Sequence, residues 1–426
     1  MKIIFNPNIE TWNQLVNRPS VDVAEMDELV RGIFLEVKSK GDLAVKKYTR
    51  YFDRAEIDSF MVSDDEFEDA ESKVSDDLKN AILVAASNIE KFHKAQQIRI
   101  NPIETTKGVS CWQQPSPIEK VGLYIPGGTA PLFSTVLMLA LPAKIAGCRE
   151  VVLCTPPSPD GKIHPAILFA AKTAGVTKVF KVGGIQAIAS MTIGTDTIPS
   201  VYKIFGPGNQ YVTAAKMEAF RYGVAIDLPA GPSEVMVVAD NTANPAFIAA
   251  DLLSQAEHGK DSQVMFVTWS ESLIEEVIKQ VDIQIETLPR KDIAKASLEN
   301  SSLVLVADKA AALDCINSYA PEHLILSLSD EDFFCKGIIN AGSVFVGNYT
   351  PESAGDYASG TNHTLPTAGF ARMYSGVSLD SFIKKISFQK ITKEGLNELG
   401  PVIMKMAAEE KLDAHKRAVE IRLSNQ

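Results

Sequence analysis

Hydrophobic positions in the first hundred residues recur at helical spacing. Leu78, Ile82, Ala85, Ile89 and Phe92 fall on one stripe of a helix. A stripe of this kind is typical of a helix that packs on a larger body. We therefore expect residues 1–117 to form a helical region, and we expect it to pack with the second of the two α/β domains that the later pattern predicts.

From about residue 121 the pattern changes to short β-branched runs separated by amphipathic stretches. The runs are Glu150 to Cys154, Lys178 to Val182, Tyr202 to Phe205, Val235 to Val238, Val264 to Thr268 and Leu303 to Val306. Such alternation is typical of parallel sheets with helical crossovers. A Pro/Gly cluster at 229–232 separates two groups of runs, so we expect one α/β domain over 118–232 and a second over 233–381. Residues 382–426 return to a charged helical pattern, which predicts a C-terminal arm.

The amino-acid composition limits which classes of function are possible for this protein. Of the 426 residues, 46% are hydrophobic and 22% are charged, which is enough apolar material for more than one core. The formal net charge of −11 argues against nucleic-acid binding, which requires a basic face. The five cysteines have irregular spacing and no C-x-x-C, so a reducing cytoplasm is the expected compartment. We expect neither a signal peptide nor a membrane-spanning segment.

Four of the six histidines lie beside carboxylates or amides in the second half of the chain. The clusters are Gln255 with His258, Glu322 with His323, Asp356 with His363, and Glu410 with His415. Imidazole together with carboxylate is a usual ligand set for zinc, and imidazole exchanges protons near neutral pH. The concentration of these residues predicts an active site.

The first two clusters each have two interpretations. Gln255 and His258 are three residues apart in a predicted helix, so they share a face and either bind a zinc ion or form a structural hydrogen bond. Glu322 and His323 follow Pro321, which predicts a loop at the end of a helix. Adjacent side chains in extended backbone point apart, so the two can act on different protons; the alternative is an ordinary surface Glu-His pair.

The other two clusters lie nearer the end of the chain. Asp356 and His363 belong to residues 350–369, which are rich in small, turn-forming residues and are typical of a functional loop. Glu410 and His415 are five apart in the predicted terminal helix, about 140° around its axis, so they share no face. A helix laid across the cleft of a neighbouring chain would bring both to one site. We therefore expect a homodimer with shared sites; the alternative is an arm folded back on its own chain.

Three glycine-containing stretches follow strand-like runs or lead into helices, at 122–128, 182–186 and 205–209. Backbone amides at such turns and helix ends hold anions such as a pyrophosphate. None of the three has the G-x-G-x-x-G spacing, so alone they indicate only tight turns. A thiol nucleophile at Cys148 or Cys154 is an alternative for aldehyde oxidation, but both flank a predicted buried strand and rank as core residues.

Five motifs, in this order, resemble the histidinol dehydrogenase family over essentially the whole chain. They are Val121-Gly-Leu-Tyr-Ile-Pro-Gly-Gly128, Phe205-Gly-Pro-Gly-Asn209, Ile226-Asp-Leu-Pro-Ala-Gly-Pro-Ser-Glu234 with Asp251-Leu-Leu-Ser-Gln-Ala-Glu-His258, Ala320-Pro-Glu-His-Leu324, and Leu412-Asp-Ala-His-Lys416. The resemblance implies two Rossmann-like parallel-sheet domains with helical extensions at both ends. It also implies oxidation of L-histidinol to L-histidine through the aldehyde, with NAD and zinc as cofactors.

The resemblance further assigns roles to single residues. It implies that zinc is bound by Gln255, His258, Asp356 and His415, and that Glu322 and His323 are the acid-base residues. It implies a substrate pocket formed by Ser233, His323, His363 and Glu410 with the zinc ligands, and NAD contacts from Tyr124, Gln186 and Asn209. By the same analogy zinc holds the imidazole and amine of the substrate, not its reacting oxygen, so the metal orients the substrate.

Three other interpretations stay open. A zinc alcohol dehydrogenase acting on another amino alcohol would stop at the aldehyde. A zinc hydrolase would use Glu322 or Glu257 with metal-bound water and would need no dinucleotide. A nucleotide-binding or scaffolding module would not be an enzyme at all. Each leaves the five ordered motifs unexplained.

Overall fold

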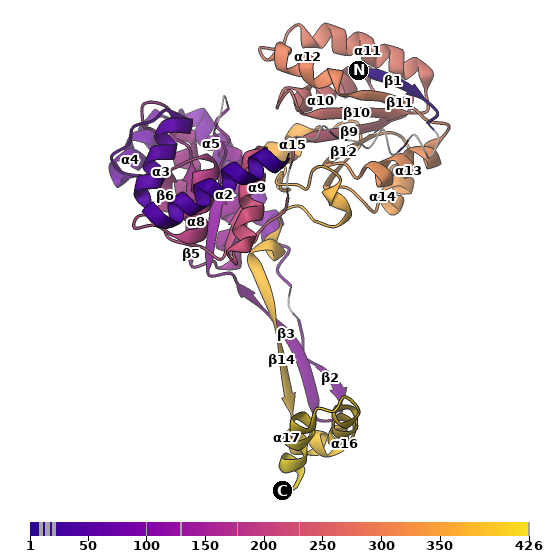
Figure 1. The fold of residues 1–426 in the computed structure, drawn as a ribbon. Helices are drawn as coiled ribbons and strands as arrows, with labels where there is room; N and C mark the ends of the chain where they lie inside the picture. Colours follow the sequence, from indigo (N-terminus) through magenta and orange to yellow (C-terminus); the bar gives the residue numbers. More distant parts are fainter. Residues whose placement is uncertain are drawn as a thin grey trace. The chain divides into compact units, whose positions relative to one another are not determined.

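The computed structural model describes residues 1–7, 12, 18, 23–98, 100–127, 130–176, 178–229 and 231–424, and for residues 23–25 the backbone alone. Gly128 and Ala230 of the sequence motifs lie outside these residues. The chain divides into two compact units (Figure 1): the first comprises Met1–Ala95 with Ile118–Phe382, and the second comprises Gln96–Pro117 with Ile383–Gln426.

The first unit contains a five-stranded parallel sheet with the strand order β6-β5-β4-β7-β8. Its strands are β4 (Lys120–Tyr124), β5 (Glu150–Thr155), β6 (Lys178–Lys181), β7 (Lys203–Phe205) and β8 (Ala225–Ile226). The crossover helices are α6 (Phe133–Ala146), α7 (Pro165–Ala174), α8 (Gly184–Ile193) and α9 (Gln210–Arg221). The order reverses between β4 and β7, and at such a switch point the carboxyl ends of the strands leave a crevice for a ligand.

The N-terminal helices form an outer layer on this first sheet. They are α2 (Val23–Lys40), α3 (Asp42–Tyr48), the short π-helix η1 (Thr49–Asp53), α4 (Asp64–Lys73) and α5 (Asp76–Lys94). Helices α4 and α5 join one hydrophobic core with α6 and α7, and α2 and α3 join another with α8 and α9. The prediction that the helical region packs with the second α/β domain is therefore wrong. Helix α6 is apolar on every side and needs cover, and an amphipathic stripe does not specify which apolar surface it meets.

A six-stranded parallel sheet in the same unit has the order β1-β11-β10-β9-β12-β13. Its strands are β1 (Lys2–Phe5), β9 (Glu234–Ala239), β10 (Gln263–Thr268), β11 (Ser302–Leu305), β12 (His323–Ser327) and β13 (Ser343–Val346). Helices α10 (Pro245–Ala256), α11 (Glu271–Ile285) and α12 (Lys291–Glu299) cover one face, and α13 (Lys309–Tyr319) and α14 (Glu331–Gly337) cover the other. Strand β1 is the one N-terminal element, among the described residues, that joins this sheet.

The segment after β13 carries α15 (Glu352–Tyr357) and the 3-10 turns η2 (Phe370–Arg372) and η3 (Leu379–Phe382). The two parallel sheets with their covering helices confirm the predicted α/β fold class. None of the described helices combines the length and the apolar character needed to cross a bilayer.

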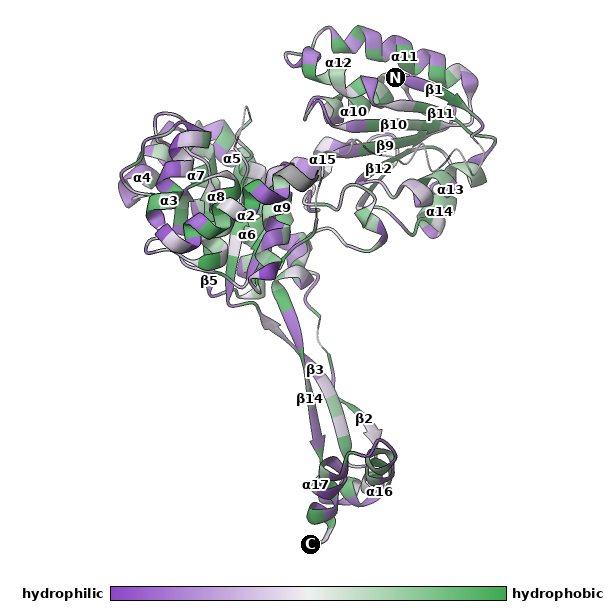
Figure 2. Ribbon diagram, in the orientation of Figure 1, coloured by the Kyte–Doolittle hydropathy of each residue, from purple (hydrophilic) through white to green (hydrophobic). Residues whose placement is uncertain are grey.

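The second unit is a small sheet with two helices. Strands β2 (Ile103–Thr106), β3 (Val109–Pro117) and β14 (Ile383–Ile391) pair antiparallel, and α16 (Lys393–Glu409) and α17 (Asp413–Ser424) follow. Two expectations are wrong here: residues 103–117 are strands within a region predicted as helical, and the arm starts with a strand. Strand β14 carries hydrophilic pairs between its hydrophobic residues (Figure 2) and so lacks strict alternation, and its partner β3 lies more than 260 residues earlier, so the pairing could not be predicted from local sequence.

Candidate active site

A cavity of about 370 Å³ lies beside the carboxyl ends of β4 and β7 and the amino ends of β9 and β12. The structure brings together in its wall seven of the residues predicted for catalysis, metal binding or substrate binding: Ser233, Gln255, His258, Glu322, His323, Asp356 and His363. They come from the end of α10, from α15 and its following loop, and from the residues just before or at the start of two neighbouring strands. Side chains far apart in the sequence therefore face one space.

Glu322 and His323 occupy the connection from α13 into β12. Helix α13 ends at Tyr319, Ala320 adopts the left-handed conformation with φ 53°, and His323 is already the first residue of the strand. The prediction of a loop after a helix holds for Glu322 only. The exposed fractions are 6% for Glu322 and 4% for His323, which excludes an ordinary surface pair.

Both side chains contact the backbone of Glu234, the first residue of β9. The Glu234 N–H donates to Glu322 Oε2 at 2.8 Å, and the Glu234 carbonyl accepts from His323 Nδ1 at 3.1 Å. His323 Nδ1 is also 3.5 Å from Glu322 Oε2, so the expectation that the two side chains point apart is wrong. Glu322 precedes the strand, where the alternation of a pleated backbone does not apply.

The second ring nitrogen of His323 faces the cavity wall formed by α15. His323 Nε2 lies 3.5 Å from Asp356 Oδ1 and is buried without a hydrogen-bond partner among the described atoms. A buried nitrogen of this kind is costly unless a ligand meets it. Because Nδ1 donates to a carbonyl, Nε2 is the atom left to exchange a proton with a substrate.

Charge in the cavity is dominated by carboxylates. Burial lowers the pKa of His323, but the charges of Glu352 and Glu322 raise it by more, so it lies well above its ordinary value. Burial raises the pKa of Glu322, and it raises that of Glu352 further. Burial also works against ionisation of Asp356, yet the nearby imidazole of His323, with its Nε2 3.5 Å from Asp356 Oδ1, holds the Asp356 pKa below its ordinary value. One imidazole thus faces two buried carboxyl groups, Glu322 and Glu352, and the partly buried Asp356.

Glu352 was missed by the sequence analysis. It is 1% exposed, and its Oε1 lies 3.7 Å from His323 Nδ1. With the amide nitrogen of Gln255 turned toward it, Glu352 accepts from Gln255, while the Gln255 oxygen accepts from the Glu234 N–H at 3.2 Å. The i, i+4 spacing of Glu352 and Asp356 could have placed both on one face of a short helix.

His258 and His363 complete the polar wall. Burial lowers the pKa of His258 and that of His363, so both favour the neutral form that can accept a proton or a metal. His363 Nδ1 lies 2.8 Å from the backbone oxygen of Asp356, and its Nε2 lies 2.9 Å from Thr135 Oγ1 on α6. These contacts fix the ring of His363 in the predicted functional loop.

The donor set fits a divalent cation. His323, Glu352 and Asp356 offer ligand atoms that lie within 4.8 Å of one another. Gln255 and His258, two of the predicted zinc ligands, line the same cavity. Nitrogen and oxygen donors of this kind suit zinc, and a cation would offset the excess of carboxyl groups.

Glu410 and His415 belong to the second unit, which is described by itself. The prediction that they share one helix is wrong. Helix α16 ends at Glu409 with Glu410 as its cap, Lys411 has φ 60°, and α17 begins at Asp413. A left-handed residue between them breaks the helix, so a separation of about 140° no longer applies. Both side chains are exposed in this unit.

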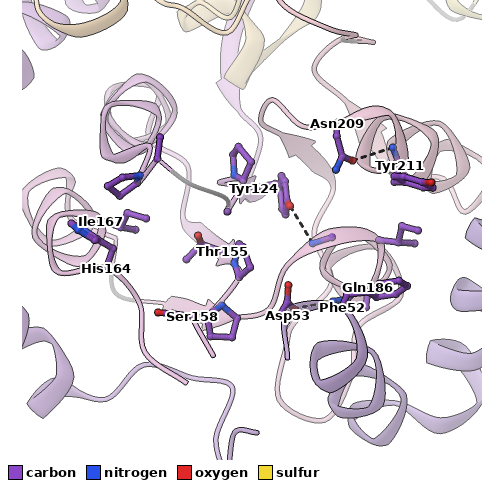
Figure 3. A pocket seen from close by; sticks show the side chains of 18 of the residues that line it. Phe52, Asp53, Tyr124, Thr155, Ser158, His164, Ile167, Gln186, Asn209 and Tyr211 are labelled. Atoms are coloured by element: carbon purple, nitrogen blue, oxygen red, sulfur yellow. Dashed lines mark hydrogen bonds between the residues drawn. The ribbon is translucent and has the colours of Figure 1, made fainter. Parts of the chain in front are cut away.

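A second cavity, of about 720 Å³, lies at the switch point of the first sheet. Tyr124, Gln186 and Asn209, the residues predicted to contact NAD, all line it (Figure 3), and Tyr124 and Asn209 also line the first cavity. Tyr124 Oη accepts from the Gly184 N–H at 3.1 Å, which ties the end of β4 to the start of α8. The two cavities thus share part of one wall.

Two polar contacts shape this second cavity. Asn209 caps α9, since its Oδ1 accepts from the N–H groups of Tyr211 at 3.1 Å and Val212 at 3.2 Å. Gln186, fully buried, donates to Asp53 Oδ2 at 3.3 Å (Figure 3). Burial raises the pKa of Asp53 to about 6. A sequence reading had no signal for Asp53, because it reaches the cavity from the separate π-helix η1.

With this geometry in view, the comparison with known sequences decides the family. The sequence model of the histidinol dehydrogenase family matches residues 16–423. The chain belongs to the histidinol dehydrogenase family. The resemblance in the five motifs is therefore confirmed.

Histidinol dehydrogenases of other organisms match this chain over nearly its whole length. A histidinol dehydrogenase of Bacteroides thetaiotaomicron is 59% identical over 424 residues, covering 100% of this chain and 99% of that protein. A chloroplastic histidinol dehydrogenase of Arabidopsis thaliana is 51% identical over 416 residues, covering 97% and 89%. The crystal structure of histidinol dehydrogenase from Elizabethkingia anophelis superposes with a TM-score of 0.98 at 54% identity, covering 100% of this chain and 98% of that one.

The thiol alternative loses support within this histidinol dehydrogenase family member. Cys154 is fully buried in β5, and burial raises the pKa of its thiol well above the ordinary range. Burial also raises the pKa of the Cys148 thiol, to about 11. Since the thiolate is the nucleophile, neither group is activated. Neither cysteine lines the two cavities described above.

Proposed function

We propose that the protein oxidises L-histidinol to L-histidine through the aldehyde, as an NAD-linked, zinc-dependent dehydrogenase of histidine biosynthesis. One observation carries the proposal: a buried acid-base pair, Glu322 and His323, lines a cavity that shares Tyr124 and Asn209 with a dinucleotide-sized cavity. Membership of the histidinol dehydrogenase family supports the choice of substrate.

The reaction needs two bases. In the first step the alcohol loses its hydroxyl proton and a hydride, which gives the aldehyde. In the second step water adds to the aldehyde, and the hydrate loses a proton and a second hydride, which gives the carboxylic acid. His323 takes the hydroxyl proton on Nε2, and Glu322 takes a proton from water. Each passes its proton to solvent before the next step.

Four residues would hold the metal: Gln255, His258, Asp356 and His415. The first three line the cavity, and His415 is the fourth by family resemblance. When bound, zinc supplies a fixed point for the imidazole and amine of histidinol, which orients the reacting carbon. Ser233, His363 and Glu410 complete the proposed substrate contacts.

The cavity at the switch point would hold NAD, which accepts one hydride in each oxidation. Tyr124 and Asn209 lie between this cavity and the acid-base pair, where a nicotinamide ring would have to lie. Gln186, in the first turn of α8, also lines this cavity. In place of the usual glycine fingerprint, the first turn of α8, whose N-cap Gly183 makes no side-chain cap hydrogen bond, would supply backbone amides to the cofactor.

We also propose a cytoplasmic homodimer in which Glu410 and His415 serve a site of the partner chain. The cysteines of the described residues are all free, which suits a reducing compartment. Nothing in the charge balance favours a nucleic-acid partner, since acidic residues outnumber basic ones by 53 to 42.

The test is the stoichiometry of NADH formation. Purified, zinc-loaded protein is given limiting histidinol and excess NAD, and NADH absorbance is compared with the histidine formed. Two NADH for each histidinol supports the proposal. One NADH with free aldehyde would indicate a simple alcohol dehydrogenase, and no NADH would refute the proposal in favour of a hydrolase or a binding module.

A further inference from the structure

Glu234 is the residue that holds the acid-base pair together. Its N–H donates to Glu322 and its carbonyl accepts from His323, so both contacts depend on the orientation of the peptide groups at the start of β9. The side chain of Glu234 points the other way, into a buried pocket where it is 2% exposed. A contact that holds the Glu234 side chain therefore also restrains the Glu234 backbone, which orients Glu322 and His323.

Arg18 holds the Glu234 carboxylate through two hydrogen bonds. Arg18 Nε donates to Glu234 Oε1 at 2.7 Å, and Nη2 donates to Oε2 at 2.9 Å. The same Nη2 donates to the Tyr319 carbonyl at 2.9 Å, and the guanidinium carbon lies 4.0 Å from the centre of the Tyr319 ring. A planar guanidinium bound to both oxygens restrains a carboxylate in rotation as well as in position.

The surroundings of this ion pair connect to other parts of the site. Glu234 Oε1 also accepts from the Ala368 N–H at 2.8 Å, in the segment that follows His363. Tyr319, which Arg18 covers, is the last residue of α13 and stands three residues before Glu322. Arg18 thus contacts the end of α13, which leads into the acid-base pair, and Glu234, whose backbone binds the pair, although it comes 216 residues before Glu234 in the sequence.

We propose that Arg18 is a positioning residue for the reaction: through Glu234 and the end of α13, it orients Glu322 and His323. This inference rests on the proposed acid-base roles of those two residues. Arg18 is not among the residues that line the cavity, so it would act through Glu234 and not on the substrate itself. Its removal would leave a buried carboxylate without its cation, and the carboxylate would move toward water and carry the Glu234 peptide with it.

The first experiment compares Arg18→Ala with wild type in steady-state kinetics. Displacement of a catalytic group by about 1 Å can cost on the order of 100-fold in rate, so we expect kcat to fall by about 10- to 100-fold. The KM for NAD should stay unchanged, because Arg18 is not among the residues that line the cavity at the switch point. Arg18→Lys keeps the charge but only one of the paired bonds, so its kcat should lie between the two.

Chemical rescue gives a sharper test. Guanidinium ion, at concentrations far below those that unfold proteins, should restore part of the kcat of Arg18→Ala, since the Arg18 side chain is 13% exposed and solvent can reach the space that it vacates. Urea has the same planar shape without the charge and should not restore it. Lys309→Ala is the matched control, because Lys309 also pairs with a carboxylate, Asp330, and lies over a ring, Phe333, away from the site. Guanidinium should not raise its kcat.

Three results would overturn the proposal: a kcat of Arg18→Ala within twofold of wild type, an equal loss of kcat and NAD affinity, or equal rescue by urea. If Arg18→Ala does not fold, the same comparison is made with Arg18→Lys and Arg18→Gln.

Histidine-labelled NMR separates this inference from the proposed function. The His323 signal, identified by its loss in His323→Asn, should shift in Arg18→Ala even if wild type forms no NADH, while the His164 signal stays in place. An unmoved His323 signal would refute positioning.

Discussion

Gly206 offers the most exacting test of how the site is built. This residue follows β7 and has φ 132°, a conformation that side chains rarely adopt. A Cβ added to it would lie 2.1 Å from the backbone oxygen of Tyr124. We therefore predict that Gly206→Ala displaces the Tyr124 peptide, and with it the ring that lines both cavities.

The size of the effect follows from two contributions. Backbone strain at an unfavourable positive φ costs about 1–3 kcal/mol. The overlap adds more, because the nearest atom is backbone and must move by about 1 Å, a displacement that can lower the rate on the order of 100-fold. We expect kcat/KM for NAD to fall by about that factor and the unfolding midpoint to drop clearly.

Gly223→Ala separates the two contributions. Gly223 has φ 82°, yet its added Cβ would meet nothing within 4 Å. Its substitution should lower the free energy of unfolding by about 1–2 kcal/mol and leave NAD affinity as in wild type. The assay is NAD titration by fluorescence, with thermal unfolding in parallel. Equal NAD affinity for both variants would refute the argument that the contact between Gly206 and Tyr124 shapes the cofactor cavity.

Four further outcomes are expected. Glu322→Gln should slow the second oxidation more than the first, so that aldehyde accumulates in single-turnover experiments; equal slowing of both steps would contradict its role toward water. His258→Asn should lose zinc and activity together by metal analysis, and full zinc content with normal activity would remove it from the metal site. Refolding Glu322→Gln chains together with His415→Asn chains should restore about one quarter of wild-type activity if dimers share their sites, and none if each arm serves its own chain. Asp53→Asn should raise the unfolding midpoint above pH 6 but not below about pH 4, because an acid whose pKa is raised to about 6 by folding destabilises the fold only where it is ionised; a uniform shift across pH would count against this.

Much of the central fold was predictable, because its strands are fully buried. The runs at Glu150, Lys178, Val235 and Val264 became β5, β6, β9 and β10, since a strand covered on both faces is apolar throughout and stands out in the sequence. Strand β12 was hidden, because it begins with a histidine directly after Pro321 and Glu322. The spacing of hydrophobic residues indicates that one face of a helix is buried, but it does not indicate which surface that face packs against. For this reason α2 to α5 were assigned to the wrong domain.

The site was predictable where chemistry is concentrated in short stretches. His258, His323 and His363 stand beside carboxylates or amides, and all three meet in one cavity. Glu352 escaped notice because it sits among small residues, and its role depends on the fold that turns it toward His323. Arg18 and Glu234 form an ion pair although they are 216 residues apart, and no local sequence pattern predicts such a contact.

Strand β1 has a consequence for how the protein is made. Its residues pair in register with β11, Lys2 beside Ser302 and Phe5 beside Leu305, so the partner strand is translated about 300 residues later. At roughly 5–20 residues per second, a ribosome takes about 15–60 s to cover that distance. During this time the first α/β domain can complete its own sheet, while Ile3 and Phe5 of β1 have no partner strand. Strand β1 can therefore complete this edge of the second sheet only after β11 has been made, while β12 and β13 are still to be translated.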